Sequence, residues 1–594
     1  MTLRNVIILP GIATVPTDRM AGQAARWKSG DKVRFFNGLP QKIGGWQKST
    51  VNTFIGKVRG TAEWPTLAAE KFIGAGSHLK LYVYKGGTFY DVTPLRSSGT
   101  LGNNPFTTTN GSAIVSVAHT SHGNLLGDYV HFSGATAVGG ITIDGQYIVT
   151  EVVDANTYKI THSIVASSGA TGGGAAVTFQ YEIHVGTADS IYGLGWGAGT
   201  WSLGTWGTAR TISNFLQNAR TWKLDNWGED LIANYRKGGI YFWDASVGTG
   251  TRATLIGAAP VTARGIFVSP EQRILVAYGA HDGTADDAMR VRWSDSENYN
   301  QWTPDVITNV AGSKRLDKGN ELLAHAKTRS GTLIFSDAFV WMMSFVGPPD
   351  TFGWTPMGSN GSIVGPNAVV EVDGLVFWMA NKNFYLYDGS LRIIPCDVHN
   401  TVFDDLNFIQ KDKVWAGSNL FFTEAWWLYP SRASLECDRY VLYNYREGTW
   451  SIGTLDRTVF VGDSKLFQTP YAFGIDGYLY DHEFGVNADG ATMNDYLESG
   501  DIEIQEGDQI MRVRKLIPDF KVLAGSIGIT LKGRKYPQRV EQFTKGPFTV
   551  NSGTAFVNPK IRARQIAVRL SANALNANWR TGTFRMELTP SGRR

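Results

Sequence analysis

The sequence predicts a mainly β protein whose largest part is a β-propeller of about six to eight degenerate blades. Of 594 residues, 68 are glycine, 12% are aromatic and 18% are charged. That composition suits short, half-buried strands joined by many tight turns. A hairpin of one type also recurs along the chain at intervals close to the length of a propeller blade. The chain is too long for one ordinary hydrophobic core, so several domains or one large closed β architecture are expected.

The recurring hairpin consists of an alternating strand, a short turn rich in Asn, Asp or Gly, and an aromatic strand that ends near an aspartate. It occupies residues 79–92, 230–246, 375–390 and 471–483, with a looser copy at 440–453. Turns of this chemistry match the twist of antiparallel strands. The aspartates that close the four better copies are Asp91, Asp244, Asp388 and Asp481. Because they repeat with the turn, we expect them to accept backbone N–H bonds rather than to act in catalysis.

The spacing of these aspartates favours a propeller. Asp244 and Asp388 are 144 residues apart, or three units of 48, and Asp388 and Asp481 are 93 apart, or two units of about 46. Propeller blades typically run about 40–50 residues, and radial repetition protects the edges of small sheets. The pattern alone leaves one alternative open, a series of unrelated hairpins in β-sandwiches.

Helical patterns are scarce. The strongest lies at residues 400–413, where Asn400 can cap a helix with one apolar face. The residues of that face are Val402, Phe403, Leu406 and Ile409.

Residues 97–185 differ from their surroundings. They are poor in tryptophan, rich in Ser, Thr, Gly and Ala, and contain several strand patterns of their own. We therefore predict a small β-sandwich or barrel inserted into a surface loop, since insertions at exposed turns are tolerated.

The last hundred residues also change in character. Their first part is acidic, and strands rich in Lys and Arg follow. The acidic residues are Glu498, Asp501, Glu503, Glu506 and Asp508. The alternation has a period of two, which predicts an antiparallel β domain with charged faces.

Charge and cysteine content narrow the function classes. The net charge of +4 argues against a protein that grips nucleic acid along a broad basic face. Two cysteines, Cys396 and Cys437, are too few for a disulfide framework and indicate folding in a reducing compartment. No apolar run approaches the roughly 18 residues of a membrane span. Pro10 and Gly11 break the only apolar stretch near the start, so no signal peptide is expected.

No motif indicates an enzyme. The sequence lacks a P-loop, a G-x-S-x-G elbow, HExxH and CxxC, and its histidines have no zinc spacing. We therefore assign no catalytic, cofactor-binding or metal-binding residues. Residues 291–304 resemble the Asp-box turn of sialidase-like propellers, although the usual glycine is missing and the spacing to Trp302 differs. This turn and the many aromatic residues leave a second hypothesis, a carbohydrate-binding or carbohydrate-cleaving propeller on a virion.

Several segments together resemble one known family. They are RWKSGDKVRFFNGLPQKIGGWQK (26–48), YGLGWGAGTWSLGTWGTAR (192–210), TWKLDNWGEDLIANYRKGGIYFWDA (221–245), GPNAVVEVDGLVFWMANKNFYLYDG (365–389), AWWLYPS (425–431), DRYVLYNYREGTWSIGTLDRT (438–458) and the ending from RARQIAVRLS to TPSGRR. In number and order these segments are similar to the tail nozzle proteins of short-tailed bacteriophages, also called tail tubular protein B or packaged-DNA stabilisation proteins. The resemblance covers nearly the whole chain. Residues 97–185 are its main departure.

The resemblance implies a structural virion protein without catalytic residues or cofactors, made in the host cytoplasm. It implies a homohexameric ring at the lower end of the tail, beneath the portal-adaptor ring, with tail fibres or spikes on its flank. The dsDNA genome would pass through the ring with weak, non-specific contacts. Each subunit would combine the propeller with a platform-like β region.

These expectations divide the chain into four segments. They are an N-terminal platform segment with the first hairpin (1–96), the inserted β domain (97–185), the propeller body (186–495) and the C-terminal antiparallel β domain (496–594). The acidic stretch 498–508 is expected to face the channel or an adjoining subunit. Trp196, Trp201 and Trp206 are expected to form a packed ribbon that joins the insert to the propeller, or alternatively an intersubunit contact.

Overall fold

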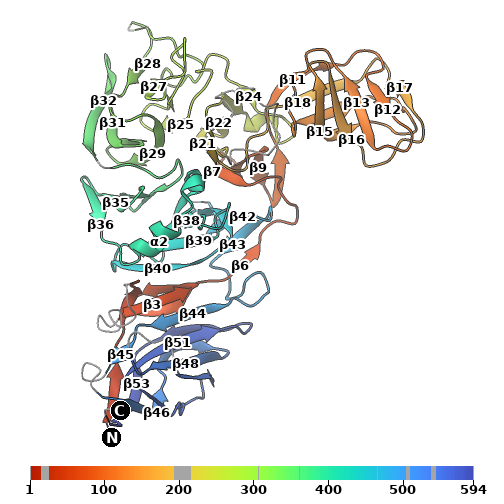
Figure 1. The fold of residues 1–594 in the computed structure, drawn as a ribbon. Coiled ribbons are helices and arrows are strands. Elements are labelled where there is room, and N and C mark those ends of the chain that lie inside the picture. Colours follow the sequence, from red (N-terminus) through yellow and green to blue (C-terminus); the bar gives the residue numbers. More distant parts are fainter. Residues whose placement is uncertain are drawn as a thin grey trace, which may run out of the picture. The chain divides into compact units, whose positions relative to one another are not determined.

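The chain folds into two compact units built almost wholly of strands (Figure 1). The computed structural model describes residues 2–14, 26–192, 216–305, 307–359, 361–464, 466–503, 509–536 and 543–592. Unit 1 comprises Met1–Thr53 and Arg315–Arg594, and unit 2 comprises Phe54–Lys314. The mainly β class predicted from composition is confirmed.

Unit 2 contains three four-stranded sheets, each made of strands that are consecutive in the chain. The strands are β7 (Val58–Pro65), β8 (Lys71–Ser77), β9 (Leu81–Lys85) and β10 (Thr88–Asp91); β21 (Trp222–Trp227), β22 (Asp230–Tyr235), β23 (Ile240–Trp243) and β24 (Thr254–Leu255); and β25 (Gly265–Ser269), β26 (Ile274–Tyr278), β27 (Arg290–Trp293) and β28 (Gly312–Arg315), which ends at the unit boundary. The first strands of neighbouring sheets lie against each other, β7 with β21 and β21 with β25.

Unit 1 contains four more sheets of the same design. Their strands are β29 (Leu322–Thr328), β30 (Gly331–Ser336), β31 (Phe339–Gly347) and β32 (Thr351–Ser359); β33 (Val369–Val372), β34 (Leu375–Met379), β35 (Phe384–Tyr387) and β36 (Leu391–Ile394); β37 (Trp415–Asn419), β38 (Glu424–Tyr429), β39 (Arg439–Asn444) and β40 (Thr449–Thr454); and β41 (Arg457–Val461), β42 (Tyr471–Gly474) and β43 (Leu479–His482) with β6 (Trp46–Lys48). Here too the first strands of successive sheets lie in contact. The last sheet takes its fourth strand, β6, from the N-terminal part of the chain.

Small sheets of consecutive strands that meet through their first strands are the blades of a β-propeller. The described residues contain seven such blades, within the predicted range, so the alternative of unrelated hairpins in sandwiches is wrong. Asp244, Asp388 and Asp481 lie at or beside the ends of the third strands in the second, fifth and seventh blades, which explains their spacing. Asp91 instead ends the fourth strand of the first blade.

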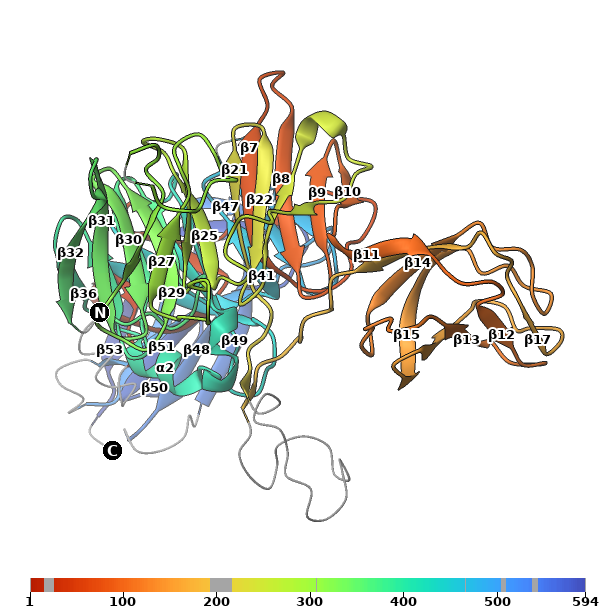
Figure 2. The same ribbon diagram turned by 90° about the horizontal axis from the view of Figure 1, so that it is seen from above.

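The insert is a small β domain of eight strands with a core of its own (Figure 2). Its strands are β11 (Leu95–Thr100), β12 (Phe106–Thr108), β13 (Ile114–Ala118), β14 (Tyr129–Ser133), β15 (Gly145–Asp154), β16 (Thr157–Thr161), β17 (Ala170–Gly172) and β18 (Thr178–Glu182). The long strand β15 pairs with β14 on one side and β16 on the other, and so joins two halves. Rings from both halves meet in the core, where Phe106 of β12 and Phe132 of β14 pack edge to face at 5.2 Å.

The platform-like β region of unit 1 consists of three further sheets, here called the terminal sheets. They interleave strands from the two ends of the chain, in the orders β1-β53-β46-β50, β2-β3-β44-β51-β48-β49 with β45 beside β51, and β4-β5-β52-β47. The strands are β1 (Thr2–Val6), β2 (Leu9–Ile12), β3 (Arg26–Asp31), β4 (Val33–Phe36), β5 (Leu39–Lys42), β44 (Asp495–Ser499), β45 (Ile502–Glu503), β46 (Met511–Ile517), β47 (Phe520–Ala524), β48 (Ile527–Arg534), β49 (Phe543–Val550), β50 (Ile561–Ala563), β51 (Gln565–Ala572), β52 (Asn578–Thr581) and β53 (Phe584–Pro590). Strands β2, β3 and β4 contact β40 of the sixth blade. The N-terminal segment therefore supplies strands to all three terminal sheets, then β6 to the seventh blade, and then leads into the first blade.

The helix expected at residues 400–413 is shorter than predicted. An α-helix, α2, covers His399–Asp405, and a separate 3-10 helix covers Phe408–Lys413. Asn400 lies inside α2 and does not cap it, whereas the Asn407 side chain accepts from the Ile409 N–H and caps the second segment. Extended backbone at Leu406 and Asn407 interrupts the helical pattern, which leaves Ile409 51% exposed.

The blades pack large rings directly onto glycine backbone. Trp222 is buried between β7 and β8, and its Nε1 donates to the Ser77 carbonyl at 2.7 Å. A Cβ added to Gly76 would lie 2.3 Å from the indole, and one added to Gly60 would lie 2.5 Å from the Trp222 carbonyl oxygen. Other blades repeat the arrangement, with Gly312 on Trp293. Glycine and tryptophan are therefore abundant together because each ring occupies the space a side chain would fill.

We expect Gly76→Ala to destabilise unit 2 by about 1–3 kcal/mol, the usual cost of forcing an extra methyl into a packed core. The loss should appear as a lower transition temperature in calorimetry of the full chain. Gly102→Ala is the matched control, because its Cβ would meet open space at an ordinary φ, and it should change stability by less than about 0.5 kcal/mol. Equal stability of the two variants would contradict the packing argument.

Candidate functional site

Glu498 lies at the centre of an ionic cluster in the second terminal sheet. It belongs to β44, and its carboxylate lies 2.9 Å from Lys28 Nζ, 2.9 Å from Lys532 Nζ and 3.0 Å from Arg569 Nη1. The three cations come from β3, β48 and β51, while the glutamate side chain is 4% exposed. Burial alone would raise the pKa of Glu498, but hydrogen bonds from Lys28, Lys532 and Arg569 hold it below its usual value. The cluster ties four strands together.

The other acidic residues of this stretch follow the same trend where they are described. Asp501 is buried and its Oδ2 lies 3.0 Å from Arg534 Nε, while Glu503 is half-buried and accepts from Gln565. The carboxylates of Glu498 and Asp501 are thus buried against cations of the same unit. The expectation that the stretch faces the channel or an adjoining subunit stays a prediction.

The remaining candidates lie outside the described residues. They are Glu506, Asp508, Trp196, Trp201 and Trp206. Their expected roles stay predictions.

Three of the four hairpin-closing aspartates accept backbone N–H bonds, as predicted. Asp244 Oδ1 accepts from the Ser246 N–H at 2.8 Å, Asp388 from that of Ser390 at 3.3 Å, and Asp91 from that of Thr93 at 3.0 Å. Asp481 differs, since it accepts from the Ser49 hydroxyl at 3.0 Å.

Asp91 has a second role at the base of the insert. Lys80 Nζ lies 2.6 Å from Asp91 and 2.9 Å from Glu182, the last residue of β18, and Arg252 reaches both carboxylates. Burial would raise the pKa of Asp91, but the charges of Lys80 and Arg252 lower it. Burial and the charge of Asp91 raise the pKa of Glu182. This cluster fastens the insert to the first two blades.

A buried arginine links a terminal sheet to a blade, and the sequence analysis missed it. Arg34 of β4 is fully buried; its Nε lies 3.2 Å from Glu424 of β38, and its Nη2 lies 2.5 Å from Glu483. Its Cζ lies 3.8 Å from the centre of the Phe422 ring. Burial raises the pKa of Glu424 to about 7, against the lowering effect of Arg34. The sequence did contain a signal for this pair: the apolar strand runs VRFF and EAWWLY each carry one charged residue, Arg34 and Glu424.

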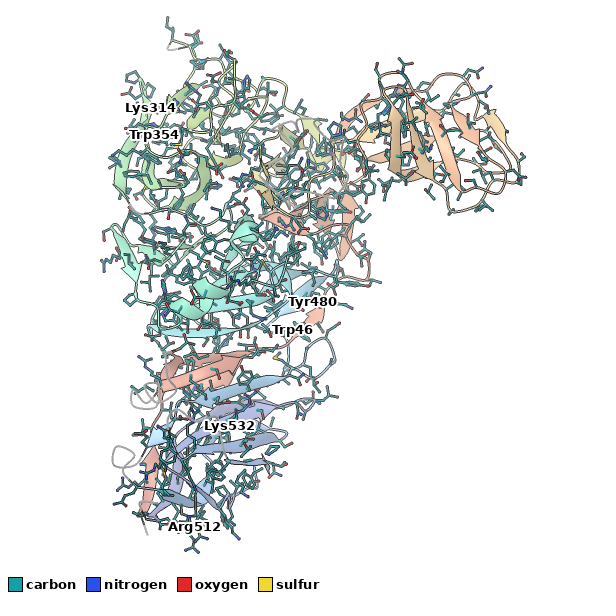
Figure 3. All side chains as sticks on the ribbon, viewed as in Figure 1. Trp46, Lys314, Trp354, Tyr480, Arg512 and Lys532 are labelled. Carbon is teal, nitrogen blue, oxygen red and sulfur yellow. The ribbon has the colours of Figure 1, made fainter. Side chains whose placement is uncertain are left out.

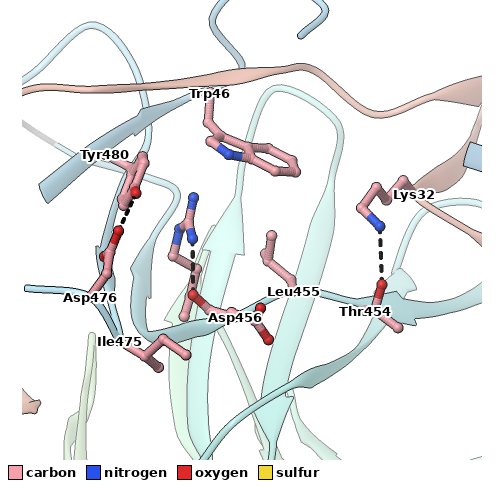
Figure 4. A pocket seen from close by; sticks show the side chains of 9 residues that line it. Lys32, Trp46, Thr454, Leu455, Asp456, Ile475, Asp476 and Tyr480 are labelled. Carbon is pink, nitrogen blue, oxygen red and sulfur yellow. Dashed lines mark hydrogen bonds between the residues drawn. The ribbon is translucent and has the colours of Figure 1, made fainter. Parts of the chain in front are cut away.

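One pocket in unit 1, of about 430 Å³, combines aromatic and ionisable side chains (Figure 4). Its lining residues are Lys32, Trp46, Thr454, Leu455, Asp456, Arg457, Ile475, Asp476 and Tyr480. Trp46 and Tyr480 come from adjacent strands of the seventh blade, β6 and β43. The Tyr480 hydroxyl donates to Asp476 Oδ2 at 2.6 Å.

Arg457 is the buried cation of this pocket. Its guanidinium lies 3.8 Å from the Tyr480 ring centre and 5.3 Å from that of Trp46. Nε donates to His482 Nε2 at 3.0 Å and Nη1 to the Asp456 carbonyl at 2.9 Å. Burial lowers the pKa of Arg457 to about 10, and burial with the arginine charge lowers that of His482. Because His482 accepts from a cation, it is held neutral. Aromatic faces beside charged groups suit a polar, planar or sugar-like solute.

The described residues show neither a membrane-spanning helix nor a group of side chains that could hold a metal ion. None of their helices is long and apolar enough to cross a bilayer. Within the same residues, no three or more His, Cys, Asp or Glu side chains are grouped to hold a metal ion.

Comparison with known proteins gives only distant likenesses. No family model and no curated protein matches the chain. Among solved structures, the endosialidase of phage phi92 is 13% identical over 62% of this chain and 63% of its own, with a TM-score of 0.21. AztD from Citrobacter koseri is 8% identical over 77% and 92%, with a TM-score of 0.28, and YCF48 from Cyanidioschyzon merolae is 9% identical over 44% and 83%, also with 0.28. One of the three is a phage protein, but likenesses this weak carry no argument about activity.

We expect Glu498→Gln to destabilise unit 1 by about 1.5–3 kcal/mol at pH 7, the range for hydrogen bonds to charged groups. The folded pKa of Glu498 lies below the ordinary 4.5, so its stabilising contribution is present above about pH 4.5 and is lost as the pH falls through the folded pKa. The difference between wild type and variant in urea unfolding should therefore shrink below pH 4.5.

Glu151→Gln provides the control, because Glu151 pairs with Lys159 on the exposed surface of the insert. It should cost less than about 1 kcal/mol at any of these pH values. A Glu498→Gln effect as small as this, or one that grows in acid, would contradict the structural role of the cluster.

Proposed function

We propose that this chain is the subunit of a phage tail nozzle, a structural protein that forms a ring, holds the packaged dsDNA genome and then lets it pass. The proposal rests on the number and order of the sequence segments that resemble this family. In the virion tail the ring would bind the portal-adaptor protein on one side and carry tail fibres or spikes. It would have no enzymatic activity.

The architecture supports this proposal in one respect. The buried ionisable groups described above are engaged in holding strands together: Glu498 within a terminal sheet, Arg34 between a terminal sheet and a blade, and Lys80 at the base of the insert. A subunit that must carry load along a tail benefits from such cross-links, since they join segments distant in sequence.

The decisive experiment is the assembly state of the purified full chain. We expect rings of about six copies with an axial opening, seen by electron microscopy and by native mass spectrometry, because closed cyclic symmetry follows from one heterologous contact repeated. Added portal-adaptor protein should bind one end of the ring. A chain that stays monomeric at micromolar concentration, alone and with the adaptor, would overturn the proposal.

The pocket around Arg457 favours a second candidate, recognition of a host-envelope carbohydrate. Trp46 and Tyr480 offer ring surfaces, and Asp456 and Asp476 offer acceptors for sugar hydroxyls. This candidate predicts millimolar or tighter binding of envelope oligosaccharides in calorimetry, weakened at least about tenfold by Trp46→Ala, the loss of one good stacking contact. Trp354→Ala, outside the pocket, is the control (Figure 3). Absence of binding and of glycan turnover leaves the nozzle as the only candidate.

A further inference from the structure

The near-neutral total charge conceals a strong segregation along the chain. Residues 511–594 contain 17 Lys and Arg against three Asp and Glu, a formal charge of +14. The preceding 510 residues contain 39 against 49, a formal charge of −10. The total charge therefore does not describe the C-terminal part of the chain.

Five of these 17 basic residues lie on one face of the first terminal sheet, β1-β53-β46-β50. Along β46 the side chains alternate, with Met511 and Val513 buried and Arg512 and Arg514 exposed. The buried side belongs to the main core of unit 1. In Figure 3, Arg512 lies at the end of the terminal sheets that points away from Trp46 and Tyr480. The solvent side, here called the arginine face, comprises Arg512, Arg514, Lys515, Arg562 and Arg585.

Three of these cations, Arg512, Arg562 and Arg585, have no acidic partner among the described residues. Arg512 pairs directly with Arg562 across β46 and β50, which puts their Cβ atoms about 4.5–5.5 Å apart. Within the described residues, neither of them nor Arg585 forms an ion pair; Arg562 Nη2 donates only to the Ser591 carbonyl at 3.1 Å. Glu587, opposite Lys515, is the one acid on the strands of this face. Like charges directly opposite one another destabilise a sheet, so an anion that neutralises them would be bound favourably.

Two features indicate which anion fits. Protein–protein interfaces have an apolar, charge-depleted centre, whereas here the apolar residues on the solvent side are Leu3 on the edge strand and the half-buried Ile517. Guanidinium groups also bind phosphate oxygens in a bidentate manner, better than ammonium groups do. An extended phosphate backbone satisfies both conditions.

We propose that the arginine face binds the phosphate backbone of duplex DNA without sequence preference. The choice of duplex DNA rests on the proposed nozzle function; the phosphate chemistry rests on the face itself. Contacts to phosphate alone give salt-dependent, sequence-independent affinity, because each neutralised phosphate releases counterions.

The test uses the full chain, in whatever assembly it forms, and a fluorescent 30-base-pair duplex whose anisotropy is followed from 50 to 200 mM NaCl. The variant carries Arg512→Gln, Arg562→Gln and Arg585→Gln. We expect its slope of log K against log [NaCl] to be shallower than that of wild type by about one for each arginine that contacts a phosphate, so by up to about three. Arg585→Gln alone should make the slope shallower by up to about one. This single variant replaces the triple variant in the test if the triple variant folds poorly.

The matched control carries Arg329→Gln, Arg432→Gln and Arg446→Gln, which remove three exposed charges elsewhere in unit 1. Its slope should equal that of wild type. A face variant that binds as wild type does, or a control that loses as much, would overturn the proposal. So would poly-L-glutamate competing as well as DNA at equal charge, since that would indicate an acidic protein partner. Ring assembly is measured separately, so failure of the nozzle proposal and failure of this one can be told apart.

Discussion

The packing of aromatic rings onto bare glycine backbone is the constraint on which the blades depend. Trp222 occupies the space that side chains at Gly60 and Gly76 would fill, and Tyr440 similarly covers Gly453. A ring so placed buries a large area at little cost in side-chain entropy and fixes the distance between two strands. This packing requires an aromatic ring at one position and a glycine at the other. The blades therefore retain this pairing, although their sequences are degenerate elsewhere.

Buried ion pairs have a different role, because they connect the terminal strands to the blades, which are distant from them in sequence. Arg34 lies near the start of the chain and its partner Glu424 lies in the sixth blade. Removing one partner of such a pair leaves an uncompensated buried charge, which is far costlier than losing an exposed pair. Each pair therefore penalises any arrangement in which the terminal strands pair out of register or leave the blade. In the other cluster, the carboxylate of Glu498 is held by three cations and is therefore a poor base.

How far the sequence predicted the structure depended on the range of the interactions. The hairpins at 230–246 and 375–390 were predictable because their turns are decided by a few neighbouring residues, and the aspartate spacing then revealed the blade repeat. The pairing of Gln41 with Arg580 could not be predicted, because strands so far apart in sequence share no local pattern. The helix at 400–413 was overpredicted because an apolar face does not show where the backbone becomes extended.

The candidate site shows the same division for a physical reason. The acidic side chains of Glu498 and Asp501 suggested an exposed surface. Exposure depends, however, on which strands lie alongside, and here the basic strands β48 and β51 supply cations that pair with both carboxylates. Net charge misled in the opposite direction. The Debye length is about 8 Å at physiological salt. A phosphate therefore responds to the charges within that distance and not to the net charge of the whole 65.1 kDa chain. A nearly neutral chain can therefore present the arginine face to a polyanion. Retention and release of a polyanion would then be set by how many arginines it meets along its path, which is a property of one sheet rather than of the whole protein.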